Sequence, residues 1–510
     1  MSLTHIRDRE RGWSEVPLVK TWQLIAASAV AGLVLSAATV SVTGPWDSGQ
    51  RKAERDRAAS WSRMGGVDHG SGRLPEAAPS APGVLSGLAA ALQAEKQAGN
   101  PLGEQAGRQP GTGTGEGTGS GSDALAGALR PLFADPALGS LRSASVIDTA
   151  TGRVLYEAKP REPMTPASTV KIATATAVLA ALGPEHRFRT TVTPGAAPGQ
   201  IILVGGGDPS LTARKKPPAG SGGSLVALAA DTAQALKAAG TDSVSLGYDD
   251  SLYSGPARHP IGLNPNVAPL SALTADEGRL NDSLSGPADR SEDPSGDTAR
   301  AFADLLADRG IKVTGAPAKA RAAADAEPLA TTLSTPLGGL VERMLTNSDN
   351  DIAEALARQS ALASGQPGSF EGAGKAVAAT LASLGIDTTG ARFADGSGLD
   401  RSDKVSAGLL TALLAKAADP QRPELRPVLT GLPVAGFNGT LRSRNSGGSP
   451  AAGLVRAKTG TLSGVNALAG TVVDPSGRLL AFAFLAANTP GPEGAEKALD
   501  KLAAAVAGTR

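Results

Sequence analysis

The chain contains no cysteine, and this absence removes several kinds of chemistry. A thiolate nucleophile, a thiolate metal site and a disulfide bond all require that residue. Histidine is also scarce: the four histidines are His5, His69, His186 and His259. No two of them are close in the sequence, so a histidine-based metal site would need carboxylates from distant segments. We therefore expect polar surface histidines and no metal.

A Ser-His-Asp triad is also disfavoured. Only His186 and His259 lie in segments that we expect to fold, and no Gly-x-Ser-x-Gly sequence offers a nucleophile for them. An excess of one charge is missing too, because the 49 basic residues nearly balance the 48 acidic ones. The composition therefore gives no reason to expect a nucleic-acid partner. With 510 residues, the chain is long enough for two or three domains and a large core.

Residues 24–43 carry no charge and match the length of a membrane-spanning helix, about 20 residues. Trp22 and Trp46 flank this stretch, and tryptophan favours the boundary between membrane and water. We predict a single transmembrane anchor here, preceded by a short cytoplasmic segment, residues 1–23. The alternative is a signal peptide that is cleaved near the small residues Ser36-Ala-Ala38.

Residues 44–123 are charged at first and then rich in Gly, Pro, Ala, Ser and Gln. A segment of this composition cannot bury enough apolar surface to fold. We predict a disordered linker that lets a folded part of the chain reach away from the membrane.

Patterns typical of β-strands occur near both ends of the remaining sequence. They cover residues 143–148, 152–157, 454–462, 467–473 and 479–487. Helical patterns fill much of the region between them. We therefore predict a mixed α/β (α+β) fold. A discontinuous domain, residues 124–190 and 335–510, would contain an antiparallel sheet flanked by helices, and residues 191–334 would form an inserted domain.

The first of three short motifs is Ser168-Thr-Val-Lys171. Thr165 is a plausible N-cap and Pro166 fits the first position of a helix, which would place Ser168 in the first helical turn. Lys171 would then lie on the same helical face as Ser168. A buried, neutral lysine can accept the proton of a serine, and the N–H of Ser168 can donate to a developing oxyanion. An isolated Ser-x-x-Lys is usually an ordinary helical sequence.

The second motif, Ser348-Asp-Asn350, opens another helical pattern. A Ser or Asn at such a position is commonly a helix cap. The functional interpretation is that Ser348 relays a proton to the leaving group and that Asn350 orients the lysine or a substrate amide.

The third motif, Lys458-Thr-Gly460, lies in a predicted strand. Glycine inside a strand often marks the close approach of another backbone, here a substrate bound along the strand edge. Lys458 would supply positive charge, Thr459 a hydroxyl for a carboxylate, and the N–H of Thr461 a second oxyanion donor. The simpler alternative is an edge-strand lysine that limits aggregation.

The three motifs in this order resemble those of the low-molecular-mass class C penicillin-binding proteins, the D-alanyl-D-alanine carboxypeptidase/endopeptidase family of serine peptidases. The resemblance covers about residues 124–510, including a long gap between Lys171 and Ser348. It extends to residues 203–210, 395–399, 439–442 and 456–462. It implies a serine transpeptidase/β-lactamase-like domain that carries an insert in that gap. We assign the 395–399 segment to a turn that shapes the site and give it no catalytic role.

The resemblance implies that Ser168 attacks the bond between two D-alanines of a peptidoglycan stem peptide, with Lys171 as base. Ser348 would help protonate the departing D-alanine, while Lys458 and Thr459 would hold the terminal carboxylate. β-Lactam antibiotics would acylate the same serine as inhibitors, and no cofactor would be required. The protein would act in the bacterial cell envelope, anchored in the plasma membrane with its catalytic domain outside, or secreted.

Two other functions share these residues. A β-lactamase uses the same acylation chemistry with fast deacylation, and the long insert argues against it. A non-catalytic envelope protein of the same fold usually has a damaged motif, and all three motifs are intact here. Carboxypeptidase and endopeptidase activities are not separated by these residues.

Overall fold

The structure is a computed structural model that describes residues 120–217, 221–445 and 448–509. The predicted cytoplasmic segment and anchor, residues 1–43, lie outside this part of the chain, as does most of the predicted linker. The final linker residues, 120–123, belong instead to the first described helix, α4 (Ser120–Phe133). Within the described ranges, no helix combines the length and the apolar character that a membrane span requires.

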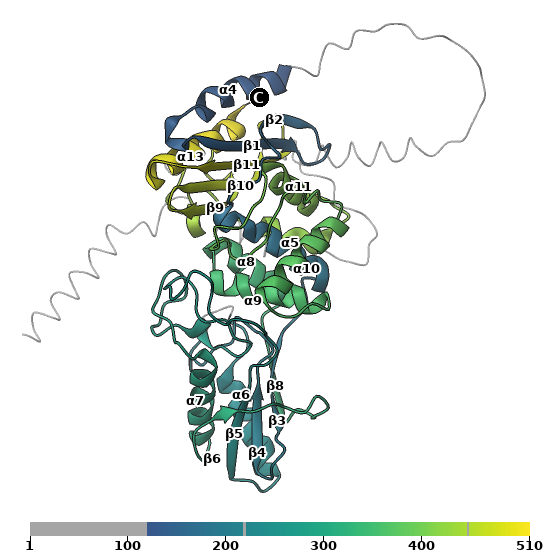
Figure 1. Ribbon diagram of the computed structural model, residues 1–510, viewed down its shortest axis with the longest axis vertical. Helices are drawn as coiled ribbons and strands as arrows, with labels where there is room; N and C mark the ends of the chain where they lie inside the picture. Colours follow the sequence, from purple (N-terminus) through teal and green to yellow (C-terminus); the bar gives the residue numbers. More distant parts are fainter. Residues whose placement is uncertain (1–119, 218–220, 446–447, 510) are drawn as a thin grey trace, which may run out of the picture. The chain divides into compact units, whose positions relative to one another are not determined.

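The five strands near the two ends of the described chain form one antiparallel sheet (Figure 1). Its order is β2-β1-β11-β10-β9, so an N-terminal strand pairs directly with the last strand of the chain. In that pairing, Leu141 faces Ala487 and Asp148 faces Leu480. The strands are β1 (Leu141–Asp148), β2 (Val154–Ala158), β9 (Arg456–Leu462), β10 (Val465–Val473) and β11 (Leu479–Ala487).

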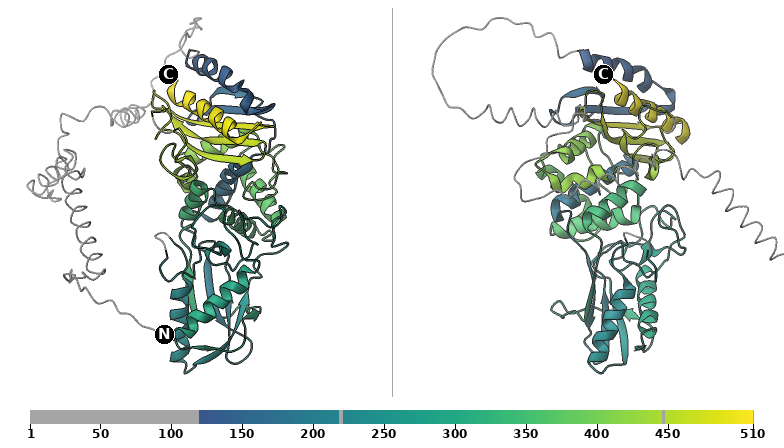
Figure 2. Two further views of the ribbon diagram at one scale, coloured as in Figure 1. Left: turned by 90° about the vertical axis from the view of Figure 1, so that its left-hand side faces the viewer. Right: turned by 180° about the vertical axis from the view of Figure 1, so that it is seen from behind.

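Helices cover both faces of this sheet, and the sequence of β11 shows why. Successive side chains on a strand point to opposite faces. Phe482 and Phe484 pack in one buried cluster with α4 and α13, whereas Ala481 and Ala483 pack in another with α5 and α11. Figure 2 shows α4 and α13 together on one face. Because both faces are buried, the strand is a continuous apolar run without polar alternation. The helices are α5 (Lys171–Leu182), α11 (Ala407–Ala418) and α13 (Pro492–Gly508).

Helix α5 is the centre of the helical layer. Its residues 171–179 are all buried, because four other helices as well as α11 pack around it. A helix that is surrounded in this way has no exposed polar face. These neighbours are α8 (Leu337–Asn347), α9 (Asn350–Ala363), α10 (Phe370–Ser383) and α12 (Arg426–Thr430).

A second sheet is formed by residues 189–333 and has its own buried core. Its order is β6-β5-β4-β3-β8, with β7 also paired to β5. Strands β4 and β5 are parallel and α6 connects them, whereas β3 is antiparallel to both β4 and β8. The chain thus enters by β3 and leaves by its neighbour β8. The elements are β3 (Arg189–Pro194), β4 (Gln200–Val204), α6 (Leu225–Ala238), β5 (Ser243–Asp249), α7 (Pro294–Ala307), β6 (Lys312–Val313), β7 (Ala318–Lys319) and β8 (Ala330–Leu333).

Candidate active site

Ser168 lies in a short 3-10 helix, η3 (Ala167–Val170), which leads into α5. The expected α-helical turn with Thr165 as N-cap is therefore wrong. The physical reason is Ala167, whose φ of +48° interrupts a regular helix start and is unfavourable for a residue with a Cβ. Thr165 instead uses its hydroxyl to donate to the carbonyl of Arg401 and to accept from Lys404. Ser168 itself is half-buried.

Lys171 lies within hydrogen-bonding distance of Ser168, as the spacing of the motif predicts. Its Nζ is 3.1 Å from Ser168 Oγ, 2.7 Å from Asn350 Oδ1 and 2.7 Å from the carbonyl oxygen of Ser397. All three partners are neutral, and the lysine is fully buried. Burial lowers the pKa of Lys171 to about 8, although nearby carboxylates, led by Asp395 and Glu354, oppose this shift.

The second motif meets the first at the junction of α8 and α9. Asp349, and not Ser348 or Asn350, caps α9 by accepting from the N–H of Ile352. Ser348 ends α8 in a left-handed conformation, with a φ of +58°. Asn350 spans two segments, because its Oδ1 accepts from Lys171 while its Nδ2 donates to the carbonyl of Asn266 at 2.9 Å.

The third motif lies on β9, which is the edge strand of the five-stranded sheet. Lys458 is fully buried and its Nζ donates to the carbonyl of Thr459 at 2.9 Å. Burial, together with the charges of Lys171 and Arg444, lowers the pKa of Lys458 well below that of a free lysine. The hydroxyl of Thr459 donates to Thr440, and that of Thr461 donates to Glu496.

Gly460 lies close to another part of the protein backbone, as a glycine inside a strand indicates. A Cβ at this position would lie 2.6 Å from the carbonyl oxygen of Pro166 and 3.2 Å from the Cβ of Ala167. The segment that precedes Ser168 therefore approaches Gly460 closely. This contact places β9 directly against the turn that presents Ser168.

A cleft of about 300 Å³ opens in front of these residues. Ser168, Ser348 and Asn350 line it, together with Thr461, which directly follows the third motif. Lys458, Thr459 and Gly460 do not line it. Residues of the 191–334 segment complete its walls. They are Asn266, Arg279, Gly286 and Arg290.

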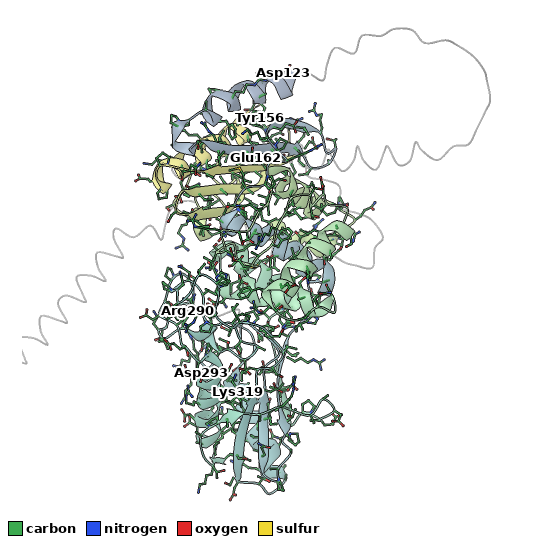
Figure 3. The ribbon with its side chains drawn as sticks, viewed as in Figure 1. Asp123, Tyr156, Glu162, Arg290, Asp293 and Lys319 are labelled. Carbon is green, nitrogen blue, oxygen red and sulfur yellow. The ribbon has the colours of Figure 1, made fainter. Side chains whose placement is uncertain are left out.

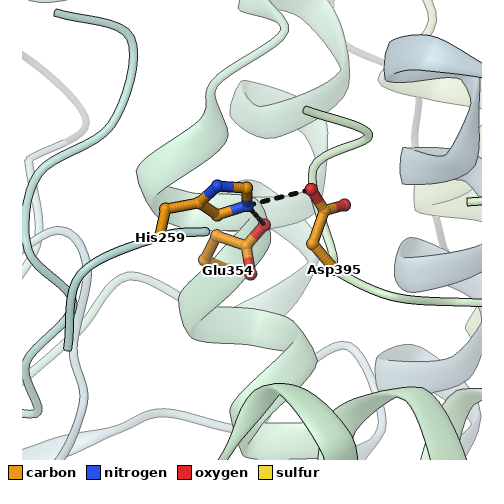
Figure 4. A group of neighbouring side chains, drawn as sticks. All are labelled: His259, Glu354 and Asp395. Atoms are coloured by element: carbon orange, nitrogen blue, oxygen red, sulfur yellow. Dashed lines mark hydrogen bonds and ion pairs between the residues drawn. The ribbon is translucent and has the colours of Figure 1, made fainter. Parts of the chain in front are cut away.

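Behind Lys171 lies a buried polar group, which we call the lysine network: Lys171, Asn350, Ser397, Asp395, Glu354 and His259. His259 is only 2% exposed, so the expectation of a surface histidine is wrong at this position. Figure 4 shows one ring nitrogen of His259 facing the carboxylates of both Glu354 and Asp395. Its Nε2 is 3.0 Å from Asp395 Oδ2 and 3.9 Å from Glu354 Oε1.

A second buried group, the arginine cluster, flanks the cleft on the side of α9. It consists of Arg279, Arg290, Arg343, Glu277, Asp349 and Asp351. Arg290, labelled in Figure 3, pairs with Asp351 at 2.8 Å. Glu277 pairs with both Arg279, at 2.8 Å, and Arg343. Burial and the neighbouring Asp349 raise the pKa of Glu277 to about 8, although Arg343 opposes this shift.

Neither group offers a ready metal site. Three ligand-type residues, His259, Glu354 and Asp395, lie close enough together to hold an ion. However, His259 Nδ1 accepts from the N–H of Ile261, so Nε2 carries the proton that it donates to Asp395. Neither ring nitrogen then has a free lone pair for a metal. In the arginine cluster, guanidinium groups already occupy positions beside the carboxyl groups.

The sequence does not predict the lysine network. The Asp395-Gly-Ser-Gly segment was assigned to a turn, and an Asp that accepts from the N–H groups two and three residues later is a usual turn-forming arrangement. The contact of the Ser397 carbonyl with Lys171 has no local signal. His259 and Glu354 reach the site from other parts of the chain, and only the tertiary structure reveals them.

Comparisons with a family model and with individual relatives indicate the same protein family. The D-Ala-D-Ala carboxypeptidase 3 (S13) family matches residues 125–289 and 286–506. Carboxypeptidase DacB of Mycolicibacterium smegmatis is 39% identical over 348 residues, which cover 66% of this chain and 74% of the relative.

Solved structures show the same fold. Penicillin binding protein 4 (dacB) of Haemophilus influenzae aligns with a TM-score of 0.60 and 23% identity, over 74% of this chain and 98% of that protein. The same protein in complex with a β-lactam aligns with a TM-score of 0.56 over the same shares of the two chains. At this level of identity, the likeness shows the mixed α/β fold alone.

Proposed function

Because the chain belongs to the D-Ala-D-Ala carboxypeptidase 3 (S13) family, we propose that it hydrolyses the bond between two terminal D-alanines of a peptidoglycan stem peptide through an acyl-enzyme on Ser168. The observation that carries this proposal is the Ser168–Lys171 pair. The lysine Nζ lies 3.1 Å from the serine Oγ, and its lowered pKa keeps a substantial neutral fraction near neutral pH.

We propose the following acylation step. Ser168 Oγ attacks the carbonyl carbon while its proton moves to Lys171 Nζ. The N–H groups of Ser168 and Thr461 stabilise the oxyanion. The C–N bond then breaks, Ser348 gives its hydroxyl proton to the departing amine and takes up the proton that Lys171 received, and D-alanine leaves. Water hydrolyses the remaining ester and regenerates Ser168.

Substrate binding involves β9 and Lys458. In the absence of substrate, the lowered pKa of Lys458 favours its neutral form. A substrate carboxylate brings a negative charge, which favours protonation of this lysine. We propose that Lys458 and the Thr459 hydroxyl hold the terminal carboxylate, and that Gly460 lets β9 lie close to the Ser168 turn. β-Lactams would acylate Ser168 and leave a slowly hydrolysed adduct.

The first experiment measures release of D-alanine from a peptide that ends in D-Ala-D-Ala, using the full-length protein. We expect release by the wild type, and a loss of at least about 10³-fold in Ser168→Ala, because the nucleophile is gone. Ser383→Ala, an exposed serine on α10, serves as the control and should retain wild-type activity. Release by Ser168→Ala at the wild-type rate would refute the proposal.

Two alternative functions are separated by this assay together with a measurement of penicillin turnover. A β-lactamase would turn over a penicillin rapidly, whereas the proposed peptidase forms a long-lived adduct. A non-catalytic protein of the same fold would release no D-alanine. Intact spacing between Ser168, Lys171 and Asn350 argues against the second alternative.

The place of action and the division into domains remain our proposals. A cell-wall substrate requires the described residues to lie outside the plasma membrane, and we propose residues 24–43 as the anchor. We also propose that residues 191–334 are an inserted domain, which the separate core of the second sheet supports. Recovery of the protein in the culture medium, shortened at its N-terminus, would favour a cleaved signal peptide over an anchor.

A further inference from the structure

His259 connects the 191–334 segment to the turn beside Lys171. Its ring packs edge-on against Phe370, with 5.3 Å between the ring centroids, and is enclosed by the protein. Nδ1 accepts from the N–H of Ile261 at 3.2 Å. This bond selects the tautomer in which Nε2–H donates to Asp395 Oδ2 at 3.0 Å. The ring therefore has one fixed orientation and one donor directed at Asp395.

Asp395 in turn organises the backbone from residue 395 to residue 400. Its Oδ1 accepts from the N–H groups of Ser397 and Gly398, and its Oδ2 accepts from that of Asp400 at 2.7 Å. The conformation of this turn determines where the carbonyl of Ser397 points. That carbonyl accepts from Lys171 Nζ at 2.7 Å and from Ser168 Oγ at 3.4 Å.

A second carboxylate supports the turn from α9. Glu354 Oε1 accepts from the N–H groups of Gly396 and Ser397, at 3.1 and 3.0 Å. Arg358 lies 3.6 Å from the other Glu354 oxygen and 4.1 Å from the centroid of the Phe370 ring. The charged groups around His259 are thus Glu354 and Arg358 from α9, and Asp395 and Asp400 from the turn.

We propose that His259 is a positioning residue for Lys171. Through Asp395 it fixes the 395–400 turn, so that the Ser397 carbonyl holds the lysine against Ser168 Oγ. This proposal rests on the proposed role of Lys171 as the base. His259 does not line the cleft that contains Ser168, so it should affect the chemical step and not substrate binding.

The test compares His259→Leu and His259→Gln with the control His186→Gln, whose histidine lies outside the network. Acylation by a penicillin is measured at saturation, which separates the rate constant from the dissociation constant of the preceding complex. In His259→Leu, we expect the rate constant to fall about 10²-fold, because a small displacement of a catalytic group has a cost of this order. The dissociation constant should stay within about twofold.

The conservative variant distinguishes positioning from simple core packing. Glutamine places an amide N–H near the position of Nε2–H, so His259→Gln should recover the rate to within about fivefold of the wild type. In His259→Leu, the pH midpoint of acylation should also move upward, because Asp395 near Lys171 loses one of its donors and keeps only those of the turn backbone and of the Asp403 carboxyl.

Three results would overturn the proposal: a folded His259→Leu with wild-type kinetics, an equal loss of rate in the leucine and glutamine variants, or a change confined to the dissociation constant. If His259→Leu does not fold, the kinetics of His259→Gln test the proposal. A rate and pH midpoint near the wild type support the proposal, and a large rate loss at unchanged thermal stability overturns it. Labelling of Ser168→Ala is a separate result that tests the proposed function alone.

Discussion

The lysine network and the arginine cluster both join the 191–334 segment to the helices around the cleft. They differ in how their charged side chains contact one another. In the arginine cluster, three guanidinium groups face three carboxylates in direct ion pairs. In the lysine network, the lysine touches only neutral oxygen atoms, and the carboxylates bind backbone N–H groups behind them.

This difference in contacts suits the arginine cluster to stabilising the fold and the lysine network to catalysis. A carboxylate in direct contact with a lysine favours the protonated form of that lysine. A lysine paired in this way would stay protonated and would be a poor base. The Ser397 carbonyl lies between Lys171 and the carboxylates. It holds the amine in position and still allows the amine to lose its proton. The comparison predicts that changes to the lysine network reduce catalysis, whereas changes to the arginine cluster reduce stability.

The largest effect should come from Lys171→Ala. Without a base at 3.1 Å, Ser168 keeps its proton, and we expect acylation by a penicillin to slow by at least about 10³-fold. Thermal stability should change little, because the variant removes a buried group whose charged form is disfavoured. Lys375→Ala, at an exposed ion pair on α10, is the control. Acylation of Lys171→Ala within tenfold of the wild type would remove the lysine from the mechanism.

The pH dependence of acylation should show the lysine titrating. The base must be neutral, and its pKa is about 8, so the rate should rise about tenfold from pH 6 to pH 7 and level off above pH 8. Glu277 in the arginine cluster also has a pKa of about 8, so Glu277→Gln is the matched control. A midpoint that disappears in Glu277→Gln would assign the titration to the arginine cluster.

The smallest effect should come from Arg343→Met in the arginine cluster. Removing one partner of a buried pair leaves a charge without compensation. Here Arg343 is 32% exposed and Glu277 can take up a proton, so we expect the free energy of unfolding at pH 7 to fall by only about 1–2 kcal/mol. Acylation should stay within about threefold. Urea unfolding measures the first quantity, with the exposed Arg300→Met as reference. If Arg343→Met slowed acylation beyond this range, the arginine cluster would also contribute to catalysis, and the prediction would be wrong.

Much of the site could be predicted from the sequence because its chemistry is local. Ser168 and Lys171 are three residues apart, and a single helical turn brings them together. The strand patterns near both chain ends likewise depend on neighbouring residues, and the observed bounds of β11 coincide with the predicted ones. The mixed α/β fold followed from these patterns.

The rest depends on packing between distant segments. The left-handed conformation of Ala167 has no sequence signal, because alanine normally favours a helix. The contact of Gly460 with Pro166 and the burial of His259 arise from segments that lie far apart in the chain. A single histidine without a nearby partner is indistinguishable from a surface residue until its surroundings are known.

The pairing of β1 with β11 has a consequence for the order of folding. Asp148 faces Leu480, so the centre of the sheet joins the first and last strands of the described chain. Contacts of such long sequence separation form slowly. During synthesis, β1 can pair with β2, but its other edge stays open until residues 479–487 emerge. A chain that stops before them leaves β1 and β10 with open edges that favour aggregation, and the strand that carries Lys458 has no completed sheet to join. The serine thus acquires its reactive surroundings only after nearly the whole protein has been made.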